Sequence, residues 1–194
     1  MLEGEASKEH RCMAVKIQKF LAFFKRMRLF KAEPLGLTDK MVLTCRRKDG
    51  TVKWVIDTDT DPMKSNSMAE TGMAQVAGLI LPDVGGTGFD YIGIGTDNTA
   101  ESASHTDLQA SIKRKAATGT RTTTTFTNDT AQLVATFSSA DSLSGLSSVK
   151  EGGVFTAASA GVMLFRKIFT AKSVNWDDGD SLEVTATCQV KQGS

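Results

Sequence analysis

The chain has few of the residues on which enzymes and disulfide-stabilised scaffolds depend. Its 194 residues include two histidines, one tyrosine, three prolines and three cysteines. Cys12, Cys45 and Cys188 are far apart and form no CxxC pair, which argues against a zinc site, and their odd number argues against a complete set of disulfides. We therefore expect reduced thiols, synthesis in a cytoplasm, and neither metal nor cofactor.

Long apolar runs and a large net charge are also lacking. No apolar run approaches the ~18 residues that a spanning helix needs, so no membrane partner is expected. With 23 Lys and Arg against 22 Asp and Glu, the net charge is +1, and we expect no nucleic-acid partner. The 40% hydrophobic and 23% charged residues are typical of a globular protein.

The charge that is present is unevenly distributed. Residues 1–31 hold eight Lys or Arg and three Glu, so this N-terminal arm carries a net charge of +5 and the remaining residues a net charge of −4. Within the arm, Ala14–Phe30 has the apolar spacing of an amphipathic helix. Such a helix covers a core, docks on a partner or lies on a membrane, and we favour the first two. The predicted partner-docking residues are the apolar stripe and two cations across the helix from it: Ile17, Phe20, Leu21, Phe24, Met27, Lys19 and Arg26.

Residues 37–83 read as a hairpin followed by a short helix. Met41–Arg46 and Thr51–Asp57 are strand-like and flank Asp49-Gly50, a tight-turn dipeptide. The acidic stretch 57–61 begins like a calcium loop, but Pro62 stands where glycine is required, so a solvated acidic turn is expected. Ser67–Leu81 has helical composition.

Beyond residue 83 the pattern is that of an all-β domain. Seven strand-like runs are separated by turn residues, a spacing that predicts an antiparallel β-sandwich, Ig-like or jelly-roll-like, over 84–194. The domains expected are thus 1–36, the basic arm and anchoring helix; 37–83, the hairpin and helix; and 84–194, the sandwich. The expected strands are Phe89–Gly95, Leu108–Lys115, Arg121–Thr127, Ala131–Ser138, Ser148–Phe155, Met163–Ala171 and Ser181–Lys191.

The motifs of catalysis are incomplete. Ser104, His105 and Asp107 are triad residue types, but a triad is a spatial arrangement and their closeness in sequence does not indicate one. The glycine clusters at 85–88 and 93–95 lack the residues that complete a phosphate loop or a dinucleotide fingerprint. We therefore expect no enzymatic activity.

Three segments resemble a loose family of tailed-bacteriophage virion proteins, described as decoration, fibre or tail-associated proteins. They are Phe89–Thr96 with its following Asn98-Thr99-Ala100 and Thr106-Asp107-Leu108, Glu151–Phe155 with Gly161–Arg166, and Asp178–Thr185. The likeness covers about residues 41–190, and its motifs are structural. The resemblance implies a structural accessory component of a virion, either a capsid decoration or attachment protein or a tail, collar or fibre component.

Further expectations follow from this resemblance. The partners would be other virion proteins, the protein would be a homo-oligomer located in the virion, and it would be made in the host cytoplasm. A host-surface glycan-binding module is the alternative of a different class. Independently of the resemblance, we expect Cys12, next to Arg11 in the arm, to be a free thiol, and an intersubunit disulfide formed after particle release is the alternative.

Overall fold

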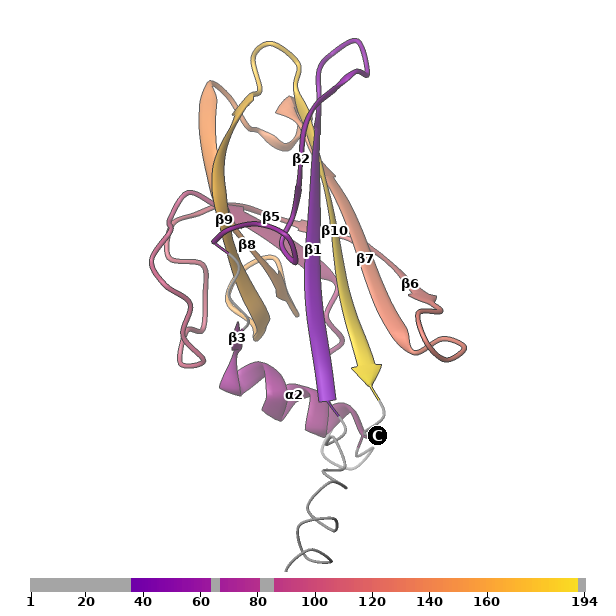
Figure 1. Ribbon diagram of the computed structural model, residues 1–194. Helices are drawn as coiled ribbons and strands as arrows, with labels where there is room; N and C mark the ends of the chain where they lie inside the picture. Colours follow the sequence, from indigo (N-terminus) through magenta and orange to yellow (C-terminus); the bar gives the residue numbers. More distant parts are fainter. Residues whose placement is uncertain (1–35, 64–66, 81–85, 192–194) are drawn as a thin grey trace, which may run out of the picture. The chain divides into compact units, whose positions relative to one another are not determined.

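The computed structural model describes residues 36–63, 67–80 and 86–191, and in them the protein is mainly β. Its strands form two antiparallel five-stranded sheets (Figure 1). The first sheet has the order β2-β1-β10-β7-β6, made of β1 (Gly36–Arg46), β2 (Val52–Asp57), β6 (Thr118–Thr122), β7 (Thr130–Phe137) and β10 (Ser181–Lys191).

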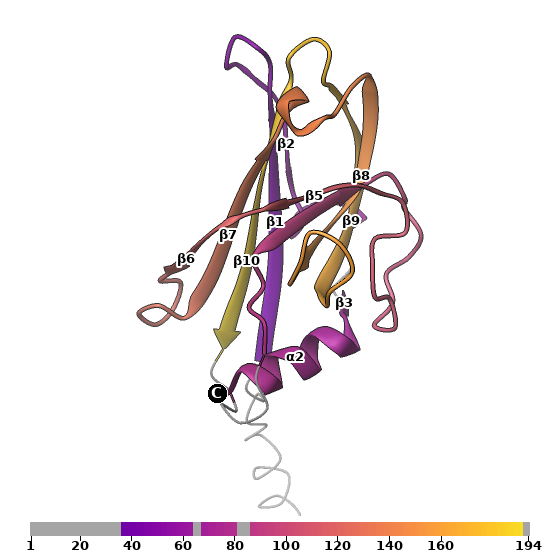
Figure 2. The same cartoon turned by 180° about the vertical axis from the view of Figure 1, so that it is seen from behind.

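The second sheet has the order β3-β9-β8-β4-β5. Its strands are β3 (Ser67–Met68), β4 (Tyr91–Gly95), β5 (Ser111–Ala116), β8 (Leu146–Phe155) and β9 (Met163–Asn175). Helix α2 (Glu70–Ile80) lies at one end of the strands, and the short 3-10 helix η1 (Ser139–Asp141) lies at the other (Figure 2). The mainly β expectation is confirmed.

The main core lies between the two sheets because alternate side chains point to the same face of a strand. On β1, Met41, Leu43 and Cys45 are buried, whereas the residues between them are half-buried. Strands of the second sheet contribute Ile92 and Phe169 to the same cluster. The core is therefore built from both sheets, as in a sandwich-like arrangement.

The second sheet is also covered on its outer face, by the connection between β4 and β5. In this connection Leu108 packs with Phe155 in a separate small cluster. A Cβ atom on Gly93 or Gly153 would approach both of these side chains to about 3 Å, so the paired glycines leave room for the cover. Burial on both faces explains why residues 163–169 of β9 are all buried.

By its contacts the chain divides into one unit of residues 37–190 and another of residues 1–36 with 191–194. The β1–β2 hairpin joins the same sheet as β6, β7 and β10, so residues 37–57 and strands beyond residue 84 share one sheet. The predicted helix over 14–30, with its docking residues, and Cys12 lie outside the described residues. Within the described residues, no helix is long and apolar enough to cross a membrane.

Two local predictions need correction. The strand expected at Arg121–Thr127 is instead Thr118–Thr122, because the Asp129 carboxylate accepts hydrogen bonds from the backbone N–H groups of Thr124, Thr125 and Phe126 and curls this segment into a loop. The acidic turn is not wholly solvated, because the buried Asp61 accepts a hydrogen bond from the Thr170 N–H. The helix expected at Ser67–Leu81 is present as α2 over Glu70–Ile80, whereas Ser67–Met68 forms β3. The Asp49-Gly50 hairpin is confirmed.

Candidate functional site

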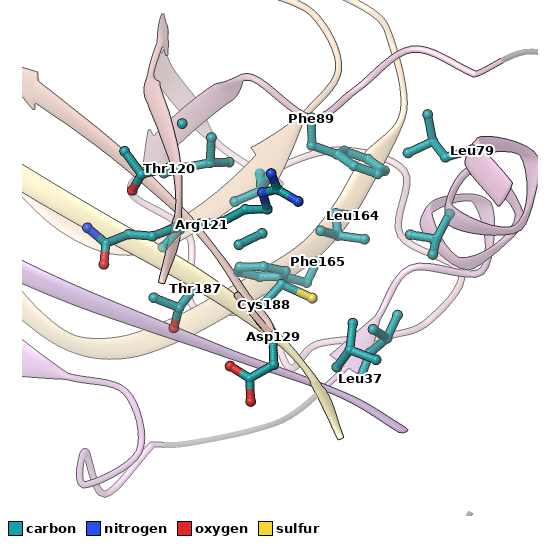
Figure 3. Close-up of a pocket in the computed structure, with 18 of the residues that line it drawn as sticks. Leu37, Leu79, Phe89, Thr120, Arg121, Asp129, Leu164, Phe165, Thr187 and Cys188 are labelled. Carbon is teal, nitrogen blue, oxygen red and sulfur yellow. The ribbon is translucent and has the colours of Figure 1, made fainter. Parts of the chain in front are cut away.

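An apolar groove of about 600 Å³ opens between the two sheets at the end where α2 lies (Figure 3). Three parts of the fold line it. The first sheet supplies the inward face of β7 and β10, the second sheet supplies β8 and β9, and α2 closes one side. The apolar side chains on these walls are Leu37, Val76, Leu79, Phe89, Leu133, Val154, Leu164, Phe165, Ala186 and Val190.

Helix α2 is held tightly against β9, and this contact fixes one wall. A Cβ atom on Gly72 would lie 2.5 Å from the Met163 carbonyl oxygen and 2.7 Å from Leu164 Cα, so only glycine permits the approach. The Ala69 N–H donates to the Leu164 carbonyl at 3.0 Å. These contacts position Val76 and Leu79 of the helix along the groove.

The apolar surface continues outside the groove. Leu79 is 46% exposed and Val190 is 48% exposed, although both line the cavity. Met73 and Ile80 on α2 are exposed as well. An exposed apolar surface that continues into a concave groove is the usual character of a binding site for another molecule.

Two charged residues lie at the groove, and only one of them is already engaged. Asp129 points away from the groove in Figure 3, and its pKa is lowered, first by the hydrogen bond from the Phe126 N–H, against the opposing effect of desolvation. Gln189 also donates to it, at 2.9 Å. Arg121 forms no ion pair within the described chain, and its guanidinium points toward the side of the groove where Phe89 lies.

A second polar cluster lies on the outer face of the second sheet. Glu151, fully buried, accepts from Arg166 Nε at 2.6 Å and from the Ala110 N–H at 2.8 Å. Arg166 also donates to the Thr99 carbonyl at 2.8 Å and contacts the Asp97 carboxylate at 3.2 Å. These bonds hold the β4–β5 connection onto the sheet, so the charges are used in the structure.

The three triad residue types are not joined to one another by hydrogen bonds in the described chain. Ser104 Oγ pairs with Ser102 Oγ at 2.8 Å, and the Asp107 carboxylate pairs with Arg114 at 2.5 Å. His105 Nδ1 is buried without a hydrogen-bond partner. The closeness in sequence therefore assembles no nucleophile and base.

The two described cysteines are protected from reaction by their surroundings. Burial raises the pKa of the Cys45 thiol to about 11, and the charge of Asp180 adds to the effect. Burial likewise raises the pKa of the Cys188 thiol to about 11, with a contribution from Asp39. Both thiols are free and protonated at neutral pH.

Comparisons of the chain with protein families, with curated proteins and with solved structures find no match. The site therefore has to be interpreted from its own geometry.

The sequence pattern did not predict the groove or the buried Glu151–Arg166 pair. The groove draws its walls from segments far apart in the chain, and only their alternation, as in Leu133 with Ala135, indicated which side chains point inward. For the pair, the available signal was a charged residue inside an apolar strand, at Glu151 in β8 and Arg166 in β9.

Proposed function

We propose that the chain is a structural accessory component of a tailed-phage virion, a capsid decoration or attachment protein that docks on another virion subunit. It performs no catalysis. The scaffold we propose is an antiparallel β-sandwich, Ig-like or jelly-roll-like, and the antiparallel pairing of the consecutive strands β4–β5, β6–β7 and β8–β9 supports it. The family resemblance of residues 41–190 supports the virion role.

The observation that carries the docking proposal is the apolar groove with its exposed margin. Its walls have the side chains of a protein core, and the exposed Leu79 and Val190 lie at its opening. Burying a Val or Leu side chain stabilises a complex by about 1.5–3 kcal/mol before ordering costs. A partner segment that fills the groove with apolar side chains therefore has a favourable place to bind.

The charge at the groove specifies the partner further. Arg121 forms no ion pair within the described chain, whereas the Asp129 carboxylate is occupied by its own loop. A carboxylate on the partner beside its apolar side chains would pair with Arg121. The proposed occupant is thus an apolar segment of another virion subunit that carries an acidic residue.

A difference between two sheet edges supports homo-oligomerisation. The outer edge of β9 is capped, because the Ile168 N–H donates to Glu101 at 2.7 Å and the Thr170 N–H donates to Asp61 at 3.2 Å. In the described chain no such side chain caps the outer edge of β6. Open edges are usually paired or covered.

Strand β6 is suited to pair with a second copy of itself. If Thr120 lies opposite Thr120 of an antiparallel copy, Thr118 faces Thr122 and Arg121 faces Gly119, so no like charges meet. Light scattering of the full chain should then give a homo-oligomer. Thr120→Pro, which removes a backbone N–H from β6, should reduce it to a monomer. A wild-type monomer at high micromolar concentration would contradict this pairing.

The docking proposal is tested by incorporation into particles. Leu79→Asp and Val190→Asp place a charge at the groove opening, on side chains about half exposed, and should leave the fold intact while abolishing incorporation. The matched control is Leu146→Asp, an equally apolar position, 70% exposed, at the start of β8 away from α2 (Figure 1). Normal incorporation of the groove variants would contradict the proposal.

The same particles separate the alternatives. A copy number per particle that follows the capsid lattice supports decoration, whereas a small fixed number at one vertex supports a tail, collar or fibre component. Binding of the purified chain to a glycan array, with no incorporation into particles, would support the glycan-binding module.

A further inference from the structure

Asp39 and Lys167 form an ion pair in the space between the two sheets. Asp39 lies on β1 of the first sheet and Lys167 lies on β9 of the second. Their side chains are 0% and 4% exposed, and Lys167 Nζ lies 3.2 Å from Asp39 Oδ2. Within the described residues, neither carboxylate oxygen of Asp39 accepts a hydrogen bond.

This combination needs an explanation. Buried carboxylates are normally compensated by several hydrogen bonds, and removing two charges from water costs more than an ion pair alone returns. Within the described residues, the neighbours on the same side of β1 as Asp39 are Leu37 and Met41, whose apolar side chains donate no hydrogen bond. On β9, Phe165 and Phe169 lie on the same side as Lys167.

We propose that Lys167 and Asp39 condense to an amide, an isopeptide cross-link between β1 and β9. The ammonium passes one proton to the carboxylate, and the Nζ lone pair then attacks Cγ. The Nζ–Cγ bond forms, one Cγ–O bond breaks, and the departing oxygen leaves as water with the transferred proton and a second proton from Nζ. No oxidant, reductant or other reactant is consumed.

Two physical terms favour the reaction. The fold places Lys167 Nζ 3.2 Å from Asp39 Oδ2, the oxygen bonded to the Cγ atom that Nζ attacks, so the two groups meet without a search through solution. The product carries no charge, so condensation removes the desolvation penalty of both ions. The partly exposed Lys40–Asp57 pair, at 2.7 Å, would gain no such relief from condensation, because water already stabilises its charges.

The decisive experiment is mass spectrometry of the purified full chain under denaturing conditions. The expected intact mass is lower than the sequence mass by one water molecule, and proteolysis should release a branched peptide joining Asp39 to Lys167. An intact mass equal to the sequence mass, with Asp39 and Lys167 recovered in separate linear peptides, overturns the proposal. This measurement on the wild-type chain is decisive even if a variant fails to fold.

Three variants sharpen the assignment. Asp39→Asn should still condense, now losing ammonia in place of water, whereas Lys167→Met should show its unmodified sequence mass. Lys40→Met is the matched control, since it removes a lysine that lies closer to its aspartate but is partly solvated, and it should keep the cross-link. A mass deficit that persists in Lys167→Met, or disappears in Lys40→Met, would overturn the assignment to Asp39 and Lys167.

Discussion

Arg166 and Lys167 are consecutive residues of β9, yet their charges are buried on opposite faces of the second sheet. Arg166 meets Glu151 within a network that includes the Thr99 carbonyl and the Ala110 N–H. Lys167 meets Asp39, whose carboxylate oxygens accept no hydrogen bond from the residues that the structure describes. The difference shows that burial alone does not decide the role of an ion pair, because the hydrogen bonds around it determine whether the charges are satisfied.

The Glu151–Arg166 pair holds the connection between β4 and β5 against the second sheet. The segment between β4 and β5 has no sheet ladder of its own, and the Glu151 carboxylate accepts from the Asp97, Gln109 and Ala110 N–H groups along it. The other pair lies between two sheets whose strands already have regular partners. The Glu151 carboxylate therefore accepts hydrogen bonds from backbone N–H groups that have no partner strand.

The largest effect should come from breaking the satisfied pair. Glu151→Ala leaves the Arg166 guanidinium buried without its carboxylate, and it leaves two or more backbone N–H groups without an acceptor. We therefore expect a loss of about 3–5 kcal/mol in the free energy of unfolding. Urea denaturation measures it. Lys40→Ala, at an exposed pair, is the control and should cost below about 1 kcal/mol, and equal losses for the two variants would remove the distinction.

A smaller effect should follow from crowding the same pair. Gly95 lies beneath it, and an added Cβ would stand 2.4 Å from Glu151 Oε1 and 2.6 Å from the Ala110 carbonyl oxygen. Gly95→Ala should therefore cost about 1–3 kcal/mol in the same denaturation experiment. Gly88→Ala, where nothing lies within 4 Å, should be within about 0.5 kcal/mol of wild type. A neutral Gly95→Ala would show that the carboxylate has other positions.

A third pair, Lys53–Asp180, provides the partly solvated case. Desolvation raises the pKa of Asp180, but the hydrogen bonds from Lys53 and the Asn175 N–H outweigh it, and the net pKa is lowered. Because the folded pKa lies below the unfolded value of about 3.9, the stabilisation is present above that value and is lost as the pH falls through the folded pKa.

This pH dependence can be measured by urea denaturation from neutral to acidic pH. Wild type should lose stability on acidification more steeply than Asp180→Asn, which cannot titrate at this position. Parallel curves for the two proteins would mean that the pair contributes nothing to the acid sensitivity.

The smallest effect concerns the thiols near these pairs. With pKa values of about 11, Cys45 and Cys188 should be mostly thiol at pH 8, with about one part in a thousand as thiolate. Alkylation followed by peptide mass spectrometry should label both residues far more slowly in the folded chain than in urea. Rapid labelling of either in the folded chain would contradict its protected environment.

Local patterns predicted much of the fold. The strand expected at Ser181–Lys191 is β10, where the alternating Leu182, Val184 and Ala186 are buried, and Asp49-Gly50 correctly marked the first hairpin, where Gly50 has φ +84. Both depend on near neighbours, whose geometry the backbone itself restricts. The boundary at Arg121–Thr127 failed, because β propensity of threonine was outweighed by the side-chain acceptor Asp129.

The candidate site, in contrast, could not be predicted from residues that are close in the sequence. Leu37, Leu79, Leu133 and Val190 come from four separate elements or connections and meet only because β1, β7 and β10 share a sheet and α2 lies at its end. Nothing in the local composition of these segments distinguishes a side chain facing a groove from one facing a filled core. The groove became identifiable only after the strand order was known.

The sequence by itself therefore determined the β class, the inward faces of the long strands and the tight turns, since each follows from the geometry of residues close in the chain. Only the tertiary structure decided which carboxylate meets which cation. Arg166 and Lys167 are adjacent and both basic, and they differ because alternate side chains of a strand enter different surroundings. Arg166 meets a carboxylate within a network of hydrogen bonds, and Lys167 meets a carboxylate that accepts none from the described residues.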